Sequence, residues 1–279
     1  MTKLLEAISK QAITEDAIET LSLTAVRELA AAYHRSIRGI ELAALGESVV
    51  PQRYLRNIGT IGIEGQMALL EATVAIVGLG GLGGYVAEAL ARMGVGHLIL
   101  IDGDTFDEHN LNRQLLSEEA NLGAAKVEVA SARVAAVNGA VTTTAHPIRI
   151  DRQNLTLLLK EAELVVDGLD RLPTRLMVEA GAQELGIPMV HGSIAGFLGQ
   201  VMTIFPGDPG LRALYGAPET APAQGMEAQL GTPAATPMAV AAWEAQEVVK
   251  VITGHGQPLR HRLLIIDFET NTTNVLELN

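Results

Sequence analysis

The feature that most constrains this sequence is a glycine-rich turn between an apolar run and a helical segment. The run ATVAIV at 72–77 leads into Gly78, Gly80, Gly81 and Gly83, spaced as G-L-G-G-L-G, and GGYVAEALARMG continues from there. Glycines let a backbone turn sharply and approach a phosphate closely, while a helix N-terminus offers unpaired N–H groups. Glycines that merely pack a helix on a sheet are the alternative. In this strand–turn–helix order, the motif predicts a nucleotide site.

Short β-branched runs alternate with Ala-rich helical stretches from residue 71 onward. Such alternation is typical of a parallel sheet covered by helices. We therefore predict an α/β fold with a Rossmann-like sheet, mostly parallel with a C-terminal antiparallel hairpin, and helices on both faces. The predicted strands are 72–77, 97–102, 142–148, 163–168 and 188–193.

The remaining segments divide around this α/β region. Residues 1–50 carry apolar positions at helical spacing and are predicted to form an N-terminal helical extension, which leaves 51–279 as the main domain. The Pro-, Gly- and Ala-rich stretch 206–237 shows neither helical nor strand periodicity, so we expect a long mobile loop there. A helix is predicted over 238–253, and the C-terminal hairpin is predicted to turn at residues 270–271.

Composition excludes several classes of function. The net charge of −12 is unfavourable for neutralising the phosphates of a nucleic acid, so no nucleic-acid partner is expected. The chain contains no cysteine, which excludes disulfides, zinc sites built on thiolates and a thiol nucleophile. No apolar run approaches the roughly 20 residues of a spanning helix, and the N-terminus lacks the order of a signal peptide. We therefore expect no membrane association and a cytoplasmic location.

The strand after the glycine turn ends in an acid and leads into a polar segment. Asp102 occupies the position at which this architecture places a carboxylate for ribose hydroxyls, as a dinucleotide-binding oxidoreductase also would. Cations in the next segment favour another chemistry, because an arginine and a lysine beside a triphosphate would stabilise charge that develops at the α-phosphorus. The polar residues of this segment are Asp104, Asn110, Arg113, Gln114 and Lys126.

A second acidic motif, Asp167-Gly168-Leu169-Asp170, closes a later apolar strand. Ligand groups of α/β sheets gather at the carboxyl ends of strands. Asp170 is the candidate Mg²⁺ ligand, because one carboxylate together with phosphate and water oxygens satisfies Mg²⁺. Taken singly, such an aspartate is more often a solvated surface charge or a capping group.

Several motifs occur in the order found in the MoeB/ThiF/HesA adenylyltransferases, relatives of the adenylation domain of ubiquitin-activating enzymes. The resemblance covers residues 53 to about 203. Arg53-Tyr54-Leu55-Arg56 resembles the family's RYxRQ motif, VGLGGLGG its phosphate loop, LIDGDTFDEHNLNRQ its acid and NLxRQ segment, GAAKVE its lysine segment, and DGLD its C-x-x-D. Residues 51–279 would accordingly form an ATP-binding adenylyltransferase domain, with a mobile crossover loop near 206–237.

The resemblance implies a role for each matching residue. Arg56 would reach into the ATP site of the neighbouring protomer, which implies a homodimer; a surface arginine on a linker is the alternative. The glycine loop and Asp104 would line the ATP site. The other implied roles are ribose binding by Asp102, phosphate contacts by Asn110, Arg113 and Gln114, charge neutralisation by Lys126, and Mg²⁺ binding by Asp170.

The implied reaction is ATP-dependent adenylation of the C-terminal glycine carboxylate of a small ubiquitin-like carrier ending in Gly-Gly, in sulfur transfer of the molybdopterin or thiamine type. Such a step needs no nucleophile on the protein, so a chain without cysteine is compatible with it. Alternatives are adenylation of another carboxylate, such as a peptide C-terminus, or a non-catalytic scaffold subunit of the same fold. Scaffold subunits usually lose the arginine, the lysine or the metal acid, and all three persist here.

The sequence departs from the family pattern at several positions. The zinc-binding C-x-x-C pairs are missing, and GLRALYG stands where the first pair would be, so no zinc is expected. Asp167 replaces the motif's cysteine, and Arg171 replaces the asparagine that usually follows the metal acid. Arg171 would either bind the substrate carboxylate or pair with Asp167. Arg175 matches a family arginine whose simpler explanation is a salt bridge, and His191, at a strand end, is more often a hydrogen-bonded core residue than a catalytic one.

Overall fold

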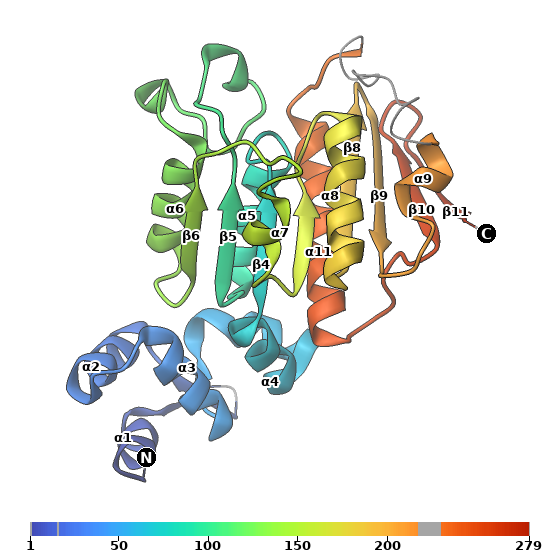
Figure 1. Ribbon diagram of the computed structural model, residues 1–279. Coiled ribbons are helices and arrows are strands. Elements are labelled where there is room, and N and C mark those ends of the chain that lie inside the picture. Colours follow the sequence, from blue (N-terminus) through green and yellow to red (C-terminus); the bar gives the residue numbers. More distant parts are fainter. Residues whose placement is uncertain (1, 16, 217–229, 279) are drawn as a thin grey trace.

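Residues 2–15, 17–216 and 230–278 are described by the computed structural model of the chain (Figure 1). Within these ranges, the central feature is an eight-stranded sheet in the order β11-β10-β9-β8-β7-β4-β5-β6. Its parallel strands are β4 (Thr73–Val77), β5 (His97–Ile101), β6 (Thr142–His146), β7 (Leu164–Asp167) and β8 (Met189–Ala195). Each remaining strand is antiparallel to its neighbours: β9 (Leu198–Ile204), β10 (Arg262–Asp267) and β11 (Thr272–Glu277). The predicted fold class is confirmed.

Two apolar cores lie on the two faces of the sheet, as alternation along a central strand requires. Val74 and Ile76 of β4 pack into one core, and Ala75 and Val77 pack into the other. The first core is covered by α4 (Leu55–Glu71), α5 (Gly83–Met93), α6 (Lys126–Val137) and α11 (Ala235–Thr253). The second is covered by α7 (Leu155–Leu159), α8 (Leu172–Leu185) and α9 (Gly210–Tyr215), as Figure 1 shows.

The five predicted strands are present, and the C-terminal hairpin turns at Asn271, which adopts a positive φ of 57°. β9 was not predicted from the sequence. Its Gly199 breaks the alternation of apolar residues, and the structure explains that glycine, because a Cβ there would overlap Val240 of α11. Packing against α11 therefore requires a glycine at a position where an alternating strand pattern is interrupted by it.

The prediction of a long loop over 206–237 needs correction. Gly210–Tyr215 forms α9, and α11 starts at Ala235, ahead of the predicted 238–253. A six-residue helix is too short to show periodicity; the buried Glu179 carboxylate holds it by accepting a hydrogen bond from the Leu211 N–H at 3.1 Å. The centre of the predicted mobile loop, 217–229, lies outside the described residues.

The N-terminal region has a core of its own below the main sheet (Figure 1). Its helices are α1 (Thr2–Gln11), α2 (Leu23–Tyr33) and α3 (Ile37–Gly46). It also contains a small sheet that the sequence analysis did not predict, of β1 (Ile13–Glu15), β2 (Ile18–Leu21) and β3 (Val50–Pro51). Strands of two to four residues are too short to carry a period-2 signal.

The 3₁₀ turn η1 (Gln52–Tyr54) leads from β3 into α4, which is interrupted at Gly62, where φ is 69°. Two further 3₁₀ turns, η2 (Glu108–Asn110) and η3 (Glu119–Asn121), lie between β5 and α6. Among the described helices, none combines the length and the hydropathy that crossing a bilayer requires.

Candidate active site

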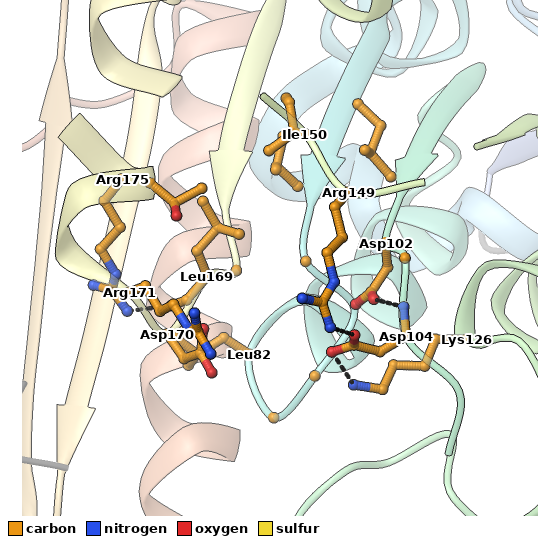
Figure 2. A pocket seen from close by; sticks show the side chains of 18 of the residues that line it. Leu82, Asp102, Asp104, Lys126, Arg149, Ile150, Leu169, Asp170, Arg171 and Arg175 are labelled. Atoms are coloured by element: carbon orange, nitrogen blue, oxygen red, sulfur yellow. Dashed lines mark hydrogen bonds and ion pairs between the residues drawn. The ribbon is translucent and has the colours of Figure 1, made fainter. Parts of the chain in front are cut away.

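A cavity of about 500 Å³ opens at the carboxyl ends of β4, β5 and β7 (Figure 2). Parallel strands of an α/β sheet bring their carboxyl ends together, so loops that are distant in sequence meet there. The predicted site residues that line the cavity are Gly78, Gly80, Gly81, Asp102, Asp104, Arg113, Gln114, Lys126 and Asp170.

The glycines of the loop serve two different purposes. Gly78 has a φ of 89°, and a Cβ there would lie 2.6 Å from the Gly168 carbonyl oxygen; a Cβ at Gly83 would overlap the carbonyl of Gly78. By contrast, a Cβ at Gly80 or Gly81 would meet its nearest neighbour at 3.6 or 3.5 Å, an ordinary contact. Gly78 and Gly83 are therefore required by the fold, whereas Gly80 and Gly81 leave backbone open to the cavity.

Asp102 fastens the glycine loop to the end of β5. Its Oδ2 accepts a hydrogen bond from the Leu79 N–H at 2.7 Å, and its Oδ1 accepts one from the Asp104 N–H at 2.8 Å. A carboxylate oxygen has two lone pairs, so both oxygens can still accept from a ligand hydroxyl.

Lys126 is the first residue of α6, and its side chain is almost fully buried against the cavity wall. The backbone places it there: Lys126 N–H donates to the Asp104 carbonyl at 3.1 Å, next to the β-bridge between Thr105 and Ala125. Its Nζ lies 3.7 Å from Asp104 Oδ2, and Arg149 donates to Asp104 Oδ1 at 3.0 Å (Figure 2). One exposed carboxylate thus bridges two cations at the mouth of the cavity.

Arg113 and Gln114 face the cavity from the segment after η2. Arg113 is half-buried and donates to the His109 carbonyl and to Asn112 Oδ1, each at 2.8 Å. Burial lowers the pKa of Arg113, and the charge of Asp170 partly opposes this shift. The buried Oε1 of Gln114 meets no hydrogen-bond donor from the described residues. This wall therefore offers both a guanidinium and an amide to a ligand.

Three predicted site residues do not line the cavity: Gly83, Asn110 and Arg56. Gly83 packs against Gly78. Asn110 is buried, and its Oδ1 accepts from the Asp107 N–H at 3.0 Å, which completes the cap of η2. It supports the segment that carries Arg113 rather than facing the cavity. Arg56 is exposed in the first turn of α4, at the opposite end of the sheet (Figure 1). Within one chain, the fold does not bring Arg56 to the cavity.

Asp170 is exposed at the cavity, beside Leu82 of the glycine loop and beside Arg171 (Figure 2). Among the described residues, no group of three or more His, Asp or Glu side chains is arranged to hold a metal ion alone. Mg²⁺ commonly takes one or two protein carboxylates and completes its shell with phosphate oxygens and water. An exposed aspartate facing a cavity of nucleotide size fits that requirement.

Asp167 does not face the cavity, and it does not make the pair with Arg171 that was one of the two alternatives for Arg171. It is fully buried and pairs with Arg175 and His191 rather than with Arg171. Burial opposes ionisation of Asp167, but Arg175 and His191 outweigh burial and hold its pKa below the usual range. Burial lowers the pKa of His191, with the Asp167 carboxylate partly opposing the shift, and His191 Nδ1 lies 2.7 Å from Asp167 Oδ2. The simpler explanations of Arg175 and His191, a salt bridge and a core hydrogen bond, describe their contacts.

The segment that follows β6 also lines the cavity, and it was not predicted from the sequence. Ile148, Arg149 and Ile150 line the cavity opposite the glycine loop and supply both apolar surface and a cation. The available signal was their place at the carboxyl end of a predicted strand, where α/β sheets gather ligand groups.

Comparison with known proteins identifies a family and several relatives. The ThiF family matches residues 54–279. The SAMP-activating enzyme E1 of Haloferax volcanii is 36% identical over 77% of this chain and 80% of its own length, and a sulfur carrier protein adenylyltransferase of Thermus thermophilus is 37% identical over 77% and 82%. Adenylyltransferase and sulfurtransferase MOCS3-2 of Zea mays is 34% identical over 81% of this chain, which spans only 48% of that longer protein.

Solved structures agree in fold. Escherichia coli MccB with ATP superposes with a TM-score of 0.71 at 20% identity, over 99% of this chain and 87% of MccB. PaaA superposes with a TM-score of 0.68 at 23% identity, over 81% and 73%. The match to residues 54–279 covers most of the chain, and relatives above 30% identity align along most of their length. The chain therefore belongs to the ThiF family.

Proposed function

We propose that this chain uses ATP to adenylate the C-terminal glycine carboxylate of a small ubiquitin-like sulfur carrier ending in Gly-Gly, with release of pyrophosphate. Similarity to a sulfur carrier protein adenylyltransferase and to a SAMP-activating enzyme supports this class of reaction. The observation that carries the proposal is that the glycine loop, Arg113, Lys126 and the exposed Asp170 converge on one cavity. Neither hydride transfer nor a scaffold role requires that set.

In the proposed complex, each wall of the cavity binds one part of ATP. The open backbone at Gly80 and Gly81 receives the phosphates, because it lies at the N-terminus of α5. Asp102 accepts hydrogen bonds from the ribose. Arg113 and Lys126 neutralise phosphate charge, and both already line the cavity.

The chemical step needs no nucleophile on this chain. A carboxylate oxygen of the carrier forms a bond to the α-phosphorus, the bond from that phosphorus to the bridging oxygen breaks, and pyrophosphate leaves with the electron pair. Positioning and charge stabilisation by the chain supply the rate. Asp170 would hold Mg²⁺, whose contribution when bound is neutralisation of phosphate oxygens.

The proposal includes an assembly. Arg56 is exposed and far from the cavity of its own chain, which is compatible with a homodimer in which it reaches the neighbouring ATP site. Residues 1–50 would form an extension to an adenylyltransferase domain at 51–279, and the segment near 206–237 would cross over the carrier tail. We place this homodimer in the cytoplasm, with neither nucleic acid nor a membrane as partner.

ATP–pyrophosphate exchange tests the proposal. The protein is assayed with Mg²⁺ and candidate Gly-Gly-ending carriers, with the Asp170→Ala protein in parallel. We expect carrier-dependent exchange that the variant loses. Exchange that appears only with a peptide C-terminus would replace the carrier with a peptide as substrate; ATP binding without any exchange would leave a scaffold role.

A further inference from the structure

The backbone of Leu169, the residue before Asp170, is held at both its N–H and its carbonyl. The Leu169 N–H donates to Asp167 Oδ1 at 3.0 Å, and the Leu169 carbonyl accepts from an Arg175 guanidinium nitrogen. That carbonyl belongs to the planar peptide bond that joins Leu169 to Asp170, so its orientation also sets the backbone nitrogen and Cα of Asp170. Asp167 and Arg175 therefore fix the backbone from which the Asp170 side chain projects.

Asp167 and Arg175 are themselves held by further contacts. Asp167 Oδ2 lies 2.7 Å from His191 Nδ1 and 3.8 Å from Arg175 Nε, and neither Asp167 nor His191 is exposed. Arg175 also donates to the Gly192 carbonyl at 3.0 Å. Asp167 and His191 are register partners on β7 and β8, so the arrangement is anchored to two adjacent strands.

The same arrangement is coupled to the phosphate loop. A Cβ at Gly168 would overlap the Gly78 carbonyl, so the segment between Asp167 and Leu169 lies directly against the glycine loop. Buried ion pairs contribute little net stability compared with apolar residues of similar volume. The hydrogen bonds made by Asp167 and Arg175 converge on the backbone of one residue, Leu169, so we expect their main effect to be on geometry.

We propose that Asp167, Arg175 and His191 are positioning residues that hold the Leu169–Asp170 peptide so that the Asp170 carboxylate faces the nucleotide. The inference rests on the proposed role of Asp170 in holding Mg²⁺ with ATP. It gives a role to Asp167, which the proposed ATP contacts do not use. Arg175 supplies the fork that reaches two carbonyls, which a lysine cannot reproduce.

Isothermal titration calorimetry of the full chain tests this without any carrier. ATP with Mg²⁺, ATP with a chelator, and AMP are titrated into wild type, Asp170→Ala, Asp167→Asn, Arg175→Lys and Arg175→Ala. Loss of outer partners of a metal ligand commonly weakens metal binding about 10- to 100-fold. We expect Arg175→Ala to lose most of the Mg²⁺-dependent gain in ATP affinity, as Asp170→Ala does, and the two milder variants to lose part of it. AMP affinity and chelated-ATP affinity should stay unchanged.

Glu179→Gln is the matched control, because it removes a buried carboxylate from the same helix, α8, that contacts α9 instead of Leu169. Folded Asp167 or Arg175 variants that keep the wild-type Mg²⁺-dependent gain in ATP affinity would overturn the inference. Equal weakening of ATP binding with and without Mg²⁺ would also overturn it, because that result indicates direct phosphate binding by Arg175. If Arg175→Ala does not fold, Arg175→Lys and Asp167→Asn decide. If Mg²⁺ does not raise the ATP affinity of wild type, the proposed role of Asp170 is overturned, and this inference with it.

Discussion

The two ends of the main sheet use similar side chains for opposite purposes. At the lower end, where the N-terminal region meets the sheet, Glu41, Arg53, Tyr54 and Asn138 form a buried polar seam. Tyr54 OH donates to Glu41 at 3.1 Å, Asn138 donates to Tyr54 at 2.9 Å, and Arg53 lies 3.3 Å from Glu41. Each member of this seam meets a partner within the chain.

At the cavity end, the polar groups are left open. Lys126 reaches only a carboxylate 3.7 Å away, Arg113 donates to neutral oxygens, and Asp170 is exposed. Both ends therefore contain a carboxyl group and an arginine. The two ends differ in what their charges contact. Charges that neutralise one another join two parts of the fold, whereas charges left open can meet a ligand. Three substitutions test this contrast.

The largest effect is expected at Lys126. Lys126→Met keeps the buried aliphatic stem and removes the charge, so ATP–pyrophosphate exchange should fall about 10²- to 10³-fold. Unfolding free energy should change by less than about 1 kcal/mol, because the lost ion pair involves a half-exposed carboxylate. Lys250→Met removes a lysine whose 2.6 Å ion pair with Glu247 lies outside the cavity, and it should leave exchange intact. Wild-type exchange by Lys126→Met would break the contrast.

The buried Glu41 of the seam should make the free energy of unfolding depend on pH. Burial raises the pKa of Glu41 to about 7, with Arg53 and Tyr54 partly opposing the shift. Below pH 4.5 the carboxyl is protonated in both states; as pH rises to about 7, the unfolded chain ionises first and wild type loses stability relative to Glu41→Gln. The loss should reach on the order of 3 kcal/mol at pH 7 and then level off.

Chemical denaturation of both proteins between pH 4 and pH 8 measures that difference. The exposed Glu28→Gln variant controls for removal of one negative charge. A stability difference between wild type and Glu41→Gln that does not vary with pH would show that Glu41 ionises freely, and the seam would then not be a low-dielectric contact.

The smallest effect is expected at Asn110, which lies near the cavity but is used by the fold. Asn110→Ala removes the cap of η2 and should lower the unfolding free energy by about 1 kcal/mol. Its effect on exchange should be smaller than that of Gln114→Ala, since Gln114 lines the cavity. Thermal unfolding and exchange of the two variants measure this. A greater loss of exchange in Asn110→Ala would restore the phosphate contact implied by the family resemblance.

Much of the fold followed from local pattern. The predicted strands, the C-terminal hairpin and the helix before Gly254 are present because period-2 runs, turn residues and a glycine cap act over a few neighbouring residues. β9 and α9 were missed for the opposite reason. β9 contains a glycine required by α11, and α9 is held by Glu179 of α8, so each depends on contacts distant in sequence.

The candidate site divides in the same way. The glycine loop, Asp102 and the cations that follow could be placed from sequence, because strand ends in a parallel sheet meet at one edge. The sequence did not separate Asn110 from its neighbours, because capping and ligand contact both use a polar side chain. Nor did it indicate Arg149, which meets Asp104 only when the segments after β5 and β6 are folded together.

By itself, the sequence determined the α/β architecture, the glycine loop, the cations beside it and the absence of thiol chemistry, since these depend on composition and on patterns within a few residues. Only the tertiary structure decided which partner each charge meets. Asp167 pairs with His191 across 24 residues, and Tyr54 with Asn138 across 84. Strand register and helix packing bring such groups together, and a sequence read residue by residue does not contain those distances.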